Sequence, residues 1–309
     1  MMRVFLLTAL VLLGWVSPAA AACNISLRNL TAVSFTSSQA YPVFQASDTG
    51  KAATFQVRHP SGQPACSYFV TFSKGGAATY SGRRMILSST ELKYQIYDSA
   101  SLSSILKEVP DAVAGEVIAG TFSGTGLVTH DLSFYVNIPQ QQVVAPNTYV
   151  DSITVRLYEG TLSSYTQRDS QTIQIRGQTV STTQVCVGCV TAFDTTLHSH
   201  ELNFGTLDTA EFKTGTVRVR SNDGYAIYLQ SANRSVLKHA TLASTVPYTA
   251  TVNGTAVTLT GTSQVLIQQV SGATAAQGVV YDVKITIGST TGALAGNYAD
   301  AITVTVTQF

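Results

Sequence analysis

Two cysteines and two histidines form the most chemically suggestive cluster in the sequence. Cys186 and Cys189 have the C-x-x-C spacing, and His198 and His200 follow shortly after them. Such a set suits either a zinc site or a redox-active dithiol. A redox C-x-x-C motif relies on a helix N-terminus to stabilise its thiolate, and no helix is predicted here. A zinc site and a plain disulfide remain as interpretations, and the export signal described below favours the disulfide.

The sequence also contains the side-chain types of a hydrolase triad. His130 and Asp131 are adjacent, and serines are scattered along the chain. Both residues lie within a predicted strand, with neither a nucleophile elbow nor a pair of carboxylates arranged for acid–base work. We therefore expect a protein that is not an enzyme and that carries no cofactor or metal.

The charge of the chain argues against nucleic acid as a partner. Charged residues make up 11% of the 309 residues, and the formal net charge is +1. Globular proteins usually have about a quarter of charged residues. Because binding to a phosphate backbone needs a basic face, this composition does not support such a function.

The N-terminus predicts export. Arg3 is followed by an apolar run over residues 4–16 and by small residues over 19–22. This pattern is typical of a cleaved secretory signal peptide, to which we assign residues 1–22. A lipoprotein site ending at Cys23 is the alternative, although the large apolar residue usual three positions before such a cysteine is missing. No later segment approaches the length of a membrane span.

In an exported chain, four cysteines predict two disulfides. The simplest pairing joins Cys23 to Cys66, and Cys186 to its near neighbour Cys189. Closing the longer of the two loops stabilises the fold by about 3 to 4 kcal/mol in the chain-entropy model.

Strand patterns dominate the chain. Segments rich in Val, Ile, Thr and Tyr are separated by Gly, Asn, Ser and Pro, with no long helical periodicity. We predict an all-β protein made of immunoglobulin-like, pilin-type β-sandwiches. The predicted strands cover residues 53–57, 67–72, 92–97, 127–138, 149–158, 172–180, 217–220, 225–230, 248–252, 256–260, 279–287 and 301–306.

The two halves of the chain repeat one pattern. CSYFVTFS at 66–73 matches DGYAIYLQS at 223–231, and APNTYVDSITVRLY at 145–158 matches LAGNYADAITVTVT at 294–307. A third match pairs ELKYQIYDS with TVPYTATVNG. The offset is roughly 150 residues in each case, which indicates a duplicated domain. We assign residues 23–181 to domain one and residues 182–309 to domain two.

One strand is missing from the second copy. In domain one, the strand at 149–158 is followed by another alternating strand at 171–180, whereas nothing follows the equivalent strand of domain two. A strand of about ten residues turns about five side chains inward, so its absence costs roughly 7 to 15 kcal/mol. We predict an open groove in domain two that a strand from another chain fills by donor-strand complementation. The groove residues are Ile302, Val304 and Val306.

Three stretches of domain one resemble a known family. CNISLRNLTAVSF after the signal peptide, RRMILSSTELKYQIYDS at 83–99 and FYVNIPQQQVVAPNTYVDSITVRLY at 134–158 are similar to the spore coat protein U domain. That family includes subunits of archaic, Csu-type chaperone-usher pili. Domain two is a more divergent copy, seen in LNFGTLDT at 202–209. It lacks the family's cysteine around residues 220–222, which leaves the pairing of its disulfide open.

The resemblance implies a route of assembly and a place in a fibre. A periplasmic chaperone lends a strand to the groove, an outer-membrane usher exports the subunit, and a neighbouring subunit then donates its own strand. With Cys23 next to the predicted cleavage point, the chain has almost no extension to donate. We therefore expect a self-complemented adhesin domain in front of an incomplete pilin domain, at the pilus tip on the cell surface. Its role is adhesion to a hydrophobic or host surface and biofilm formation. The alternative is a structural spore-coat or pilus-shaft subunit without an adhesive role.

The pole of domain one that points away from the fibre is the expected contact surface. In such a sandwich it carries the loops at 59–65, 98–126 and 159–170. We predict that exposed apolar residues on two of these loops make the contact. They are Leu102, Ile105, Leu106, Val109, Val113, Val117, Ile118, Leu162 and Tyr165. The alternative is that the long middle connection folds back and buries its side chains.

Overall fold

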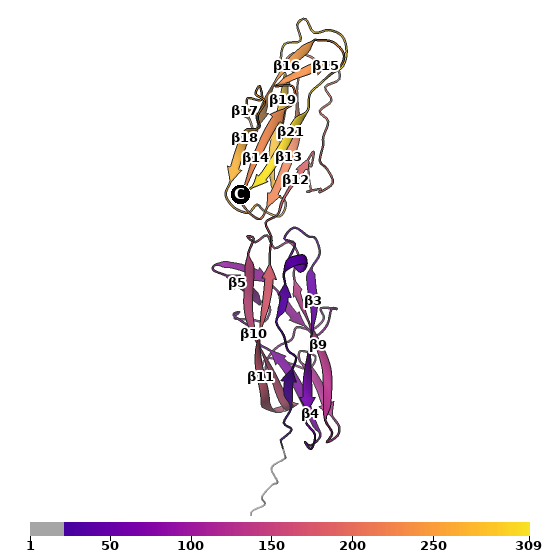
Figure 1. Cartoon of the computed structure of the whole chain (residues 1–309), viewed down its shortest axis with the longest axis vertical. Coiled ribbons are helices and arrows are strands. Elements are labelled where there is room, and N and C mark those ends of the chain that lie inside the picture. The colour runs from indigo at the N-terminus through magenta and orange to yellow at the C-terminus, as the bar shows by residue number, and fades with distance from the viewer. Residues whose placement is uncertain (1–21) are drawn as a thin grey trace, which may run out of the picture.

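The computed structural model describes residues 22–309, so the predicted signal peptide lies outside the described residues except for its last position. Two β-sandwiches follow one another along a rod (Figure 1). Within the described residues, the only helix is a short 3-10 turn at Ser37–Gln39. None of the described helical structure is long and apolar enough to cross a membrane. The prediction of tandem all-β sandwiches is confirmed.

Domain one packs a four-stranded sheet, in the order β1-β3-β9-β7, against a larger sheet in the order β2-β11-β10-β4-β8. A hairpin formed by β5 and β6 attaches to β10. The strands are β1 (Ser26–Arg28), β2 (Val33–Phe35), β3 (Thr49–His59), β4 (Cys66–Phe72), β5 (Arg84–Leu87), β6 (Thr90–Lys93), β7 (Gln95–Tyr97), β8 (Ile118–Phe122), β9 (Val128–Ile138), β10 (Thr148–Thr161) and β11 (Ser164–Gln178).

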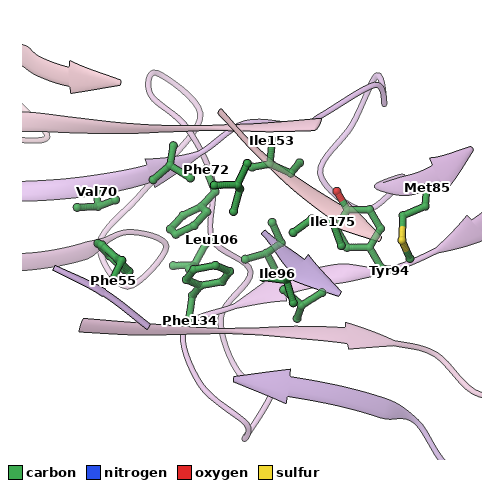
Figure 2. Close-up of a cluster of buried hydrophobic side chains, with 14 of the residues drawn as sticks. Phe55, Val70, Phe72, Met85, Tyr94, Ile96, Leu106, Phe134, Ile153 and Ile175 are labelled. Atoms are coloured by element: carbon green, nitrogen blue, oxygen red, sulfur yellow. The ribbon is translucent and has the colours of Figure 1, made fainter. Parts of the chain in front are cut away.

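The core of domain one lies between these sheets because alternate residues of each strand face inward. Phe55, Phe72 and Phe134 form its aromatic centre, with ring centroids 4.9 to 6.5 Å apart. Ile153 of β10 and Ile175 of β11 pack into the same core (Figure 2). The last strand of domain one therefore belongs to its own core.

Domain two repeats this arrangement with a smaller second sheet. One sheet has the order β12-β13-β19-β16-β15-β20, with β17 paired to β16, and the other has only three strands, β18-β14-β21. The strands are β12 (Thr183–Val187), β13 (Phe212–Ser221), β14 (Tyr225–Ser231), β15 (Val236–His239), β16 (Thr245–Val252), β17 (Thr255–Val257), β18 (Val265–Val270), β19 (Val279–Ile287), β20 (Tyr298–Ala299) and β21 (Ile302–Gln308).

Two hydrogen bonds occur at equivalent places in both domains. The Tyr94 hydroxyl donates to the Asp151 carboxylate at 2.7 Å, and the Tyr248 hydroxyl donates to the Asp300 carboxylate at 2.6 Å. Burial, followed by the nearby carboxylate, raises the pKa of both phenols. The phenols therefore stay protonated and able to donate.

A tyrosine at the start of the last matched strand gives the second repeated bond. The hydroxyl of Tyr149 donates to the carbonyl of Ala145 at 2.8 Å, and that of Tyr298 donates to Leu294 at 2.8 Å. This is the tyrosine corner of immunoglobulin-like sandwiches. The duplication seen in the sequence thus extends to individual hydrogen bonds.

The two domains meet through the β13–β14 turn of domain two. The side-chain amide of Asn222 is 1% exposed and donates to the carbonyls of Val144 and Val180, at 3.0 Å each. The Arg220 guanidinium lies 4.7 Å from the ring centroid of Phe44, in domain one. At the position where the family's cysteine is missing, the chain therefore uses a polar side chain to connect the two domains.

The buried side chain of Arg83 connects the end of β4, strand β7 and the connection that follows β7. Its side chain is fully buried and donates to the carbonyls of Phe72, Ser73 and Leu106 at 2.7 to 3.1 Å. It also donates to the Gln95 side chain at 2.7 Å. Burial lowers the pKa of Arg83 to about 10, which leaves it charged at neutral pH. This guanidinium holds the connection after β7 against the end of β4.

We expect Arg83→Met to lower the free energy of unfolding of domain one by about 3 kcal/mol, because it leaves several buried carbonyls without a donor. The adjacent Arg84 is a matched control. It forms a partly exposed ion pair with Glu91, so Arg84→Met should cost less than about 1 kcal/mol. Thermal and urea unfolding of the two variants measure the difference, and equal losses would contradict the role given to Arg83.

Candidate functional site

The last strand of the chain, β21, has a strand partner on only one edge. It pairs antiparallel with β14, from Ile302 opposite Ser231 to Gln308 opposite Tyr225. Among residues 22–309, no strand pairs with its other edge. The equivalent strand of domain one, β10, is flanked by β4 on one side and by β11 on the other. Domain two therefore lacks the counterpart of β11, as the sequence predicted.

The missing neighbour changes the burial of the apolar row on β21. Ile302, Val304 and Val306 pack against the core of domain two but are only partly buried. In domain one, each of the three equivalent side chains has an exposed fraction of 0%: Ile153, Val155 and Leu157. The predicted groove residues thus face the core and stay partly accessible because no strand covers them.

The segment that would flank a missing strand on its other side is also unpaired. In domain one, β2 pairs in parallel with β11, with Val33 opposite Ile175. The matching segment of domain two, residues 202–209, forms no strand. Leu202 and Phe204 from this segment nevertheless pack against the core. β21 is thus unpaired on one of its edges, and residues 202–209 have no strand partner.

Polar contacts fix both ends of β21. Just before the strand, the Asp300 carboxylate accepts from the hydroxyls of Ser231 and Tyr248 at 2.6 Å each, and from the Asn233 backbone N–H at 2.9 Å. At the other end, the Gln308 side chain contacts the Thr183 hydroxyl at 2.8 Å. These contacts therefore hold β21, with its unpaired edge, in position.

We define the distal pole as the end of domain one that lies away from domain two. It consists of residues 60–65, 123–127 and the β10–β11 turn at 162–163. The Gly62 N–H donates to the Thr125 carbonyl at 2.7 Å, which ties two of these loops together. The β10–β11 hairpin is longer than predicted, because both strands continue to the pole and leave only a tight turn.

The structure corrects the predicted contact surface at Leu106. This residue is completely buried, and Figure 2 shows it among Phe72, Phe134 and Ile96 inside the sandwich. Its backbone N–H donates to the Ile96 carbonyl at 3.0 Å, so the connection after β7 folds back onto the core. Leu106 is a core residue and not part of a surface.

The other predicted contact residues divide by exposure. Val113 and Tyr165 are exposed, with 60% and 41% of their surface accessible. The remaining residues are half-buried: Leu102, Ile105, Val109, Val117, Ile118 and Leu162. Ile118 begins β8, which the sequence did not predict as a strand. Only the end of the long connection, at residues 123–126, reaches the distal pole.

Sequence reasoning missed two features of this region. Leu127 and Val128, at the start of the strand predicted at 127–138, are 58% and 40% exposed at or beside the pole, and the sequence reasoning did not include them in the contact surface. An open pocket of about 430 Å³ lies on the outer face of the sheet, lined in part by Phe69, Val117 and Leu162. The pocket could not be predicted because β8 and the β10–β11 turn bring its walls together.

Both predicted disulfides are confirmed, Cys23 with Cys66 and Cys186 with Cys189. The second disulfide uses both thiols of the C-x-x-C motif, which overturns the zinc interpretation of that motif. His130 accepts or donates a hydrogen bond at Nδ1 with the Tyr68 hydroxyl, at 2.8 Å, rather than with a serine. His130 and Asp131 thus do not form a catalytic triad in the described structure.

The two sandwiches, each with a tyrosine corner, and the incomplete second sheet define a tandem immunoglobulin-like protein of the pilin type. Residues 9–156 match the Spore Coat Protein U domain. The N-terminal part of the chain is therefore similar to the spore coat protein U domain, which agrees with the resemblance found in the sequence. No curated protein matches the chain as a relative.

Several solved structures are similar to the whole chain. One is the CsuC–CsuE chaperone–tip adhesion subunit complex of Acinetobacter baumannii archaic Csu pili, with 15% identity, coverage of 92% of this chain and 100% of that chain, and a TM-score of 0.46. The CupB6 tip adhesin of Pseudomonas aeruginosa has 12% identity, 92% and 94% coverage, and a TM-score of 0.38. CfaE, the adhesive subunit of CFA/I fimbria of enterotoxigenic Escherichia coli, has 12% identity, 78% and 81% coverage, and a TM-score of 0.33. At TM-scores this low, we draw no functional conclusion from them.

The difference in burial between the two domains predicts different mutational costs. In the chain without a partner, we expect Val304→Ser to lower the free energy of unfolding of domain two by about 1 kcal/mol. Val155→Ser, at the equivalent but fully buried position of domain one, should cost about 3 kcal/mol. Calorimetric unfolding of the two variants tests this, and equal costs would show that β21 is already covered.

Proposed function

We propose that the chain is an exported pilus subunit whose second domain is completed by a β-strand from another chain. The observation that carries the proposal is the unpaired edge of β21, with Ile302, Val304 and Val306 only partly buried beneath it. Domain one has its own last strand and presents the distal pole to a surface. Attachment and contact would then use opposite ends of the rod (Figure 1).

An unpaired apolar edge is a hazard for an exported protein. An edge strand offers a row of backbone N–H and C=O groups to any other strand, and natural proteins usually protect such edges. Here the edge lies beside a partly covered core. Pairing with an added strand would satisfy the backbone and bury the apolar row in the same step. A periplasmic chaperone would protect the edge first, and a neighbouring subunit would take it over after passage through the usher.

Domain one shows what an added strand must supply. Its β11 places Ile173 opposite Ile153, and Ile175 opposite Asp151, so aliphatic side chains fill the core at these positions. Opposite Tyr149 stands Gly177, where a Cβ atom would lie 2.7 Å from the side chain of Leu92. By analogy within the chain, a donor should place aliphatic residues opposite Asp300 and Ile302, and a small residue opposite Tyr298.

Domain one also supports a position at the end of a fibre. Its own β11 pairs with β10 along the whole hairpin, so it has no equivalent of the open edge. Cys23 is completely buried in its disulfide, and its backbone N–H contacts the Glu159 carboxylate at 3.2 Å. The chain from Cys23 onward is thus committed to the fold of domain one. We infer a tip adhesin that accepts a strand in domain two and acts in adhesion and biofilm formation through domain one.

Self-complementation tests the acceptor role. A copy of residues 166–180 is added after Phe309 through an Asn-Gly turn, which favours a tight two-residue hairpin and places the copies of Ile173 and Ile175 opposite Ile302 and Asp300. We expect the extended chain to be monomeric, with domain two stabilised by about 3 to 6 kcal/mol from the added buried aliphatic side chains. The control carries serine at the two positions copied from Ile173 and Ile175, and it should gain little. A wild-type domain two that is already as stable as the extended one would refute donor-strand completion.

Substitutions at the distal pole (Leu127) and beside it on β11 (Tyr165) test the adhesive role. We expect Leu127→Ser combined with Tyr165→Ser to reduce attachment to an apolar surface about tenfold, because a few central residues usually dominate a contact. Leu242→Ser is the control, since Leu242 is exposed on domain two. Unchanged attachment would exclude this pole as the contact surface. Immunogold labelling of assembled fibres separates a tip adhesin, seen only at the ends, from a shaft or coat subunit, seen along their length.

A further inference from the structure

His59 makes an unusual pair of hydrogen-bond contacts at the end of β3. The side chain has an exposed fraction of 0%. Its Nδ1 lies 3.0 Å from the Gly126 carbonyl oxygen, and its Nε2 lies 2.9 Å from the Pro64 carbonyl oxygen. The two carbonyls belong to two different loops of the distal pole.

Both partners of the ring are acceptors, which constrains its protonation state. A neutral imidazole has one N–H donor and one nitrogen lone pair, whereas the imidazolium has two donors. With one proton, a nitrogen lone pair would face a carbonyl oxygen at about 3 Å, where two acceptors repel each other. With two protons, both contacts become hydrogen bonds to a charged donor, which are the stronger kind.

No acidic side chain of the described residues bonds to His59 to stabilise a positive charge on its ring. Neither ring nitrogen has a carboxylate partner among residues 22–309. The two loops themselves, 60–65 and 123–127, contain no charged or titratable residue. The ring centroid of Phe122 lies 4.9 Å from that of His59, and an aromatic face favours a nearby cation.

Four other titratable or charged groups lie on the elements packed around this site. His130 of β9 lies on Phe122, with centroids 4.2 Å apart, and contacts the Tyr68 hydroxyl. Burial raises the pKa of Tyr68 to about 12, so this phenol stays neutral. Glu159 pairs with Arg168 beside the Cys23 backbone, which leaves that pair close to neutral as a unit.

We propose that His59 is a proton-dependent clasp that joins two loops of the distal pole. When protonated, it holds the Pro64 and Gly126 carbonyls together across the pole. When it loses a proton, one carbonyl is released, and the remaining link between the loops is the Gly62 to Thr125 bond. Both contacts can be hydrogen bonds only when the ring carries two protons, so the clasp closes as the pH falls and opens as the pH rises. The inference deepens the proposed function, and rests on it only for the consequence that an adhesive surface responds to acidity.

The test uses the full exported chain between about pH 5 and pH 8, the interval in which histidine changes charge. Nitrogen-15 NMR of the imidazole groups should show N–H at both ring nitrogens of His59 at the lower pH. After correction for intrinsic rates, amide hydrogen exchange in residues 60–65 and 123–127 should rise about tenfold at the higher pH. In His59→Phe, which keeps the ring, the exchange of both loops should be fast and independent of pH. His198→Phe, at an exposed position in domain two, should behave as the wild type.

A single neutral tautomer of His59 throughout this range, or loop exchange that follows intrinsic rates alone, would overturn the proposal. If His59→Phe does not fold, the NMR signals of the wild-type ring still decide the matter. Both measurements report on domain one. Their outcome is therefore independent of whether domain two accepts a strand and whether the pole binds a surface.

Discussion

The apolar row on the last matched strand of each sandwich is fully covered only when that strand has a neighbour on each edge, and this constraint distinguishes the two domains. In domain one, β10 has both neighbours, and its inward aliphatic side chains are fully buried. In domain two, β21 has one neighbour, and the same row of side chains is only partly covered. The two copies thus differ at the one place where a partner could be added. We infer that domain one is complete by itself, whereas domain two assembles with another chain.

The open edge is useful only if it keeps its shape while unpaired. Asp300 provides this by accepting hydrogen bonds from Ser231 and Tyr248, which lie on β14 and β16 in different sheets. Because the same Tyr–Asp pair occurs in domain one, where the sheet is complete, it is a property of the fold rather than of the open edge. Domain two therefore retains the frame of a complete sandwich without one of its strands.

Domain one combines a dense interior with loops held by polar contacts at its far end. The buried guanidinium of Arg83 uses backbone carbonyls as partners, and so does the His59 ring. Both side chains hold irregular segments that have no strand ladder of their own, and for Arg83 the bonds also satisfy buried carbonyls, which would be costly to leave without a donor. The connection after β7 is thus part of the core, and the proposed contact surface is limited to the loops that reach the pole.

Much of this could be predicted from the sequence, because alternation of apolar residues and repetition of a pattern are local properties. The strand at 279–287, the duplication, both disulfides and the lack of a strand after β21 all followed from residue order alone. Short strands such as β1, β2 and β8 did not, since a few residues carry no clear period and form strands only through their partners.

The location of side chains in space was decided by the tertiary structure. Leu106 has the sequence context of an exposed loop, yet Arg83 and Ile96 hold its backbone and place its side chain in the core. The pairing of His59 with two loop carbonyls has no sequence signal, because it depends on where separate loops meet. The sequence by itself determined that one strand is missing; only the packing of two sheets decided which side chains its absence leaves open. The physical reason is that hydrophobic periodicity is encoded along the chain, whereas burial depends on residues far apart in sequence.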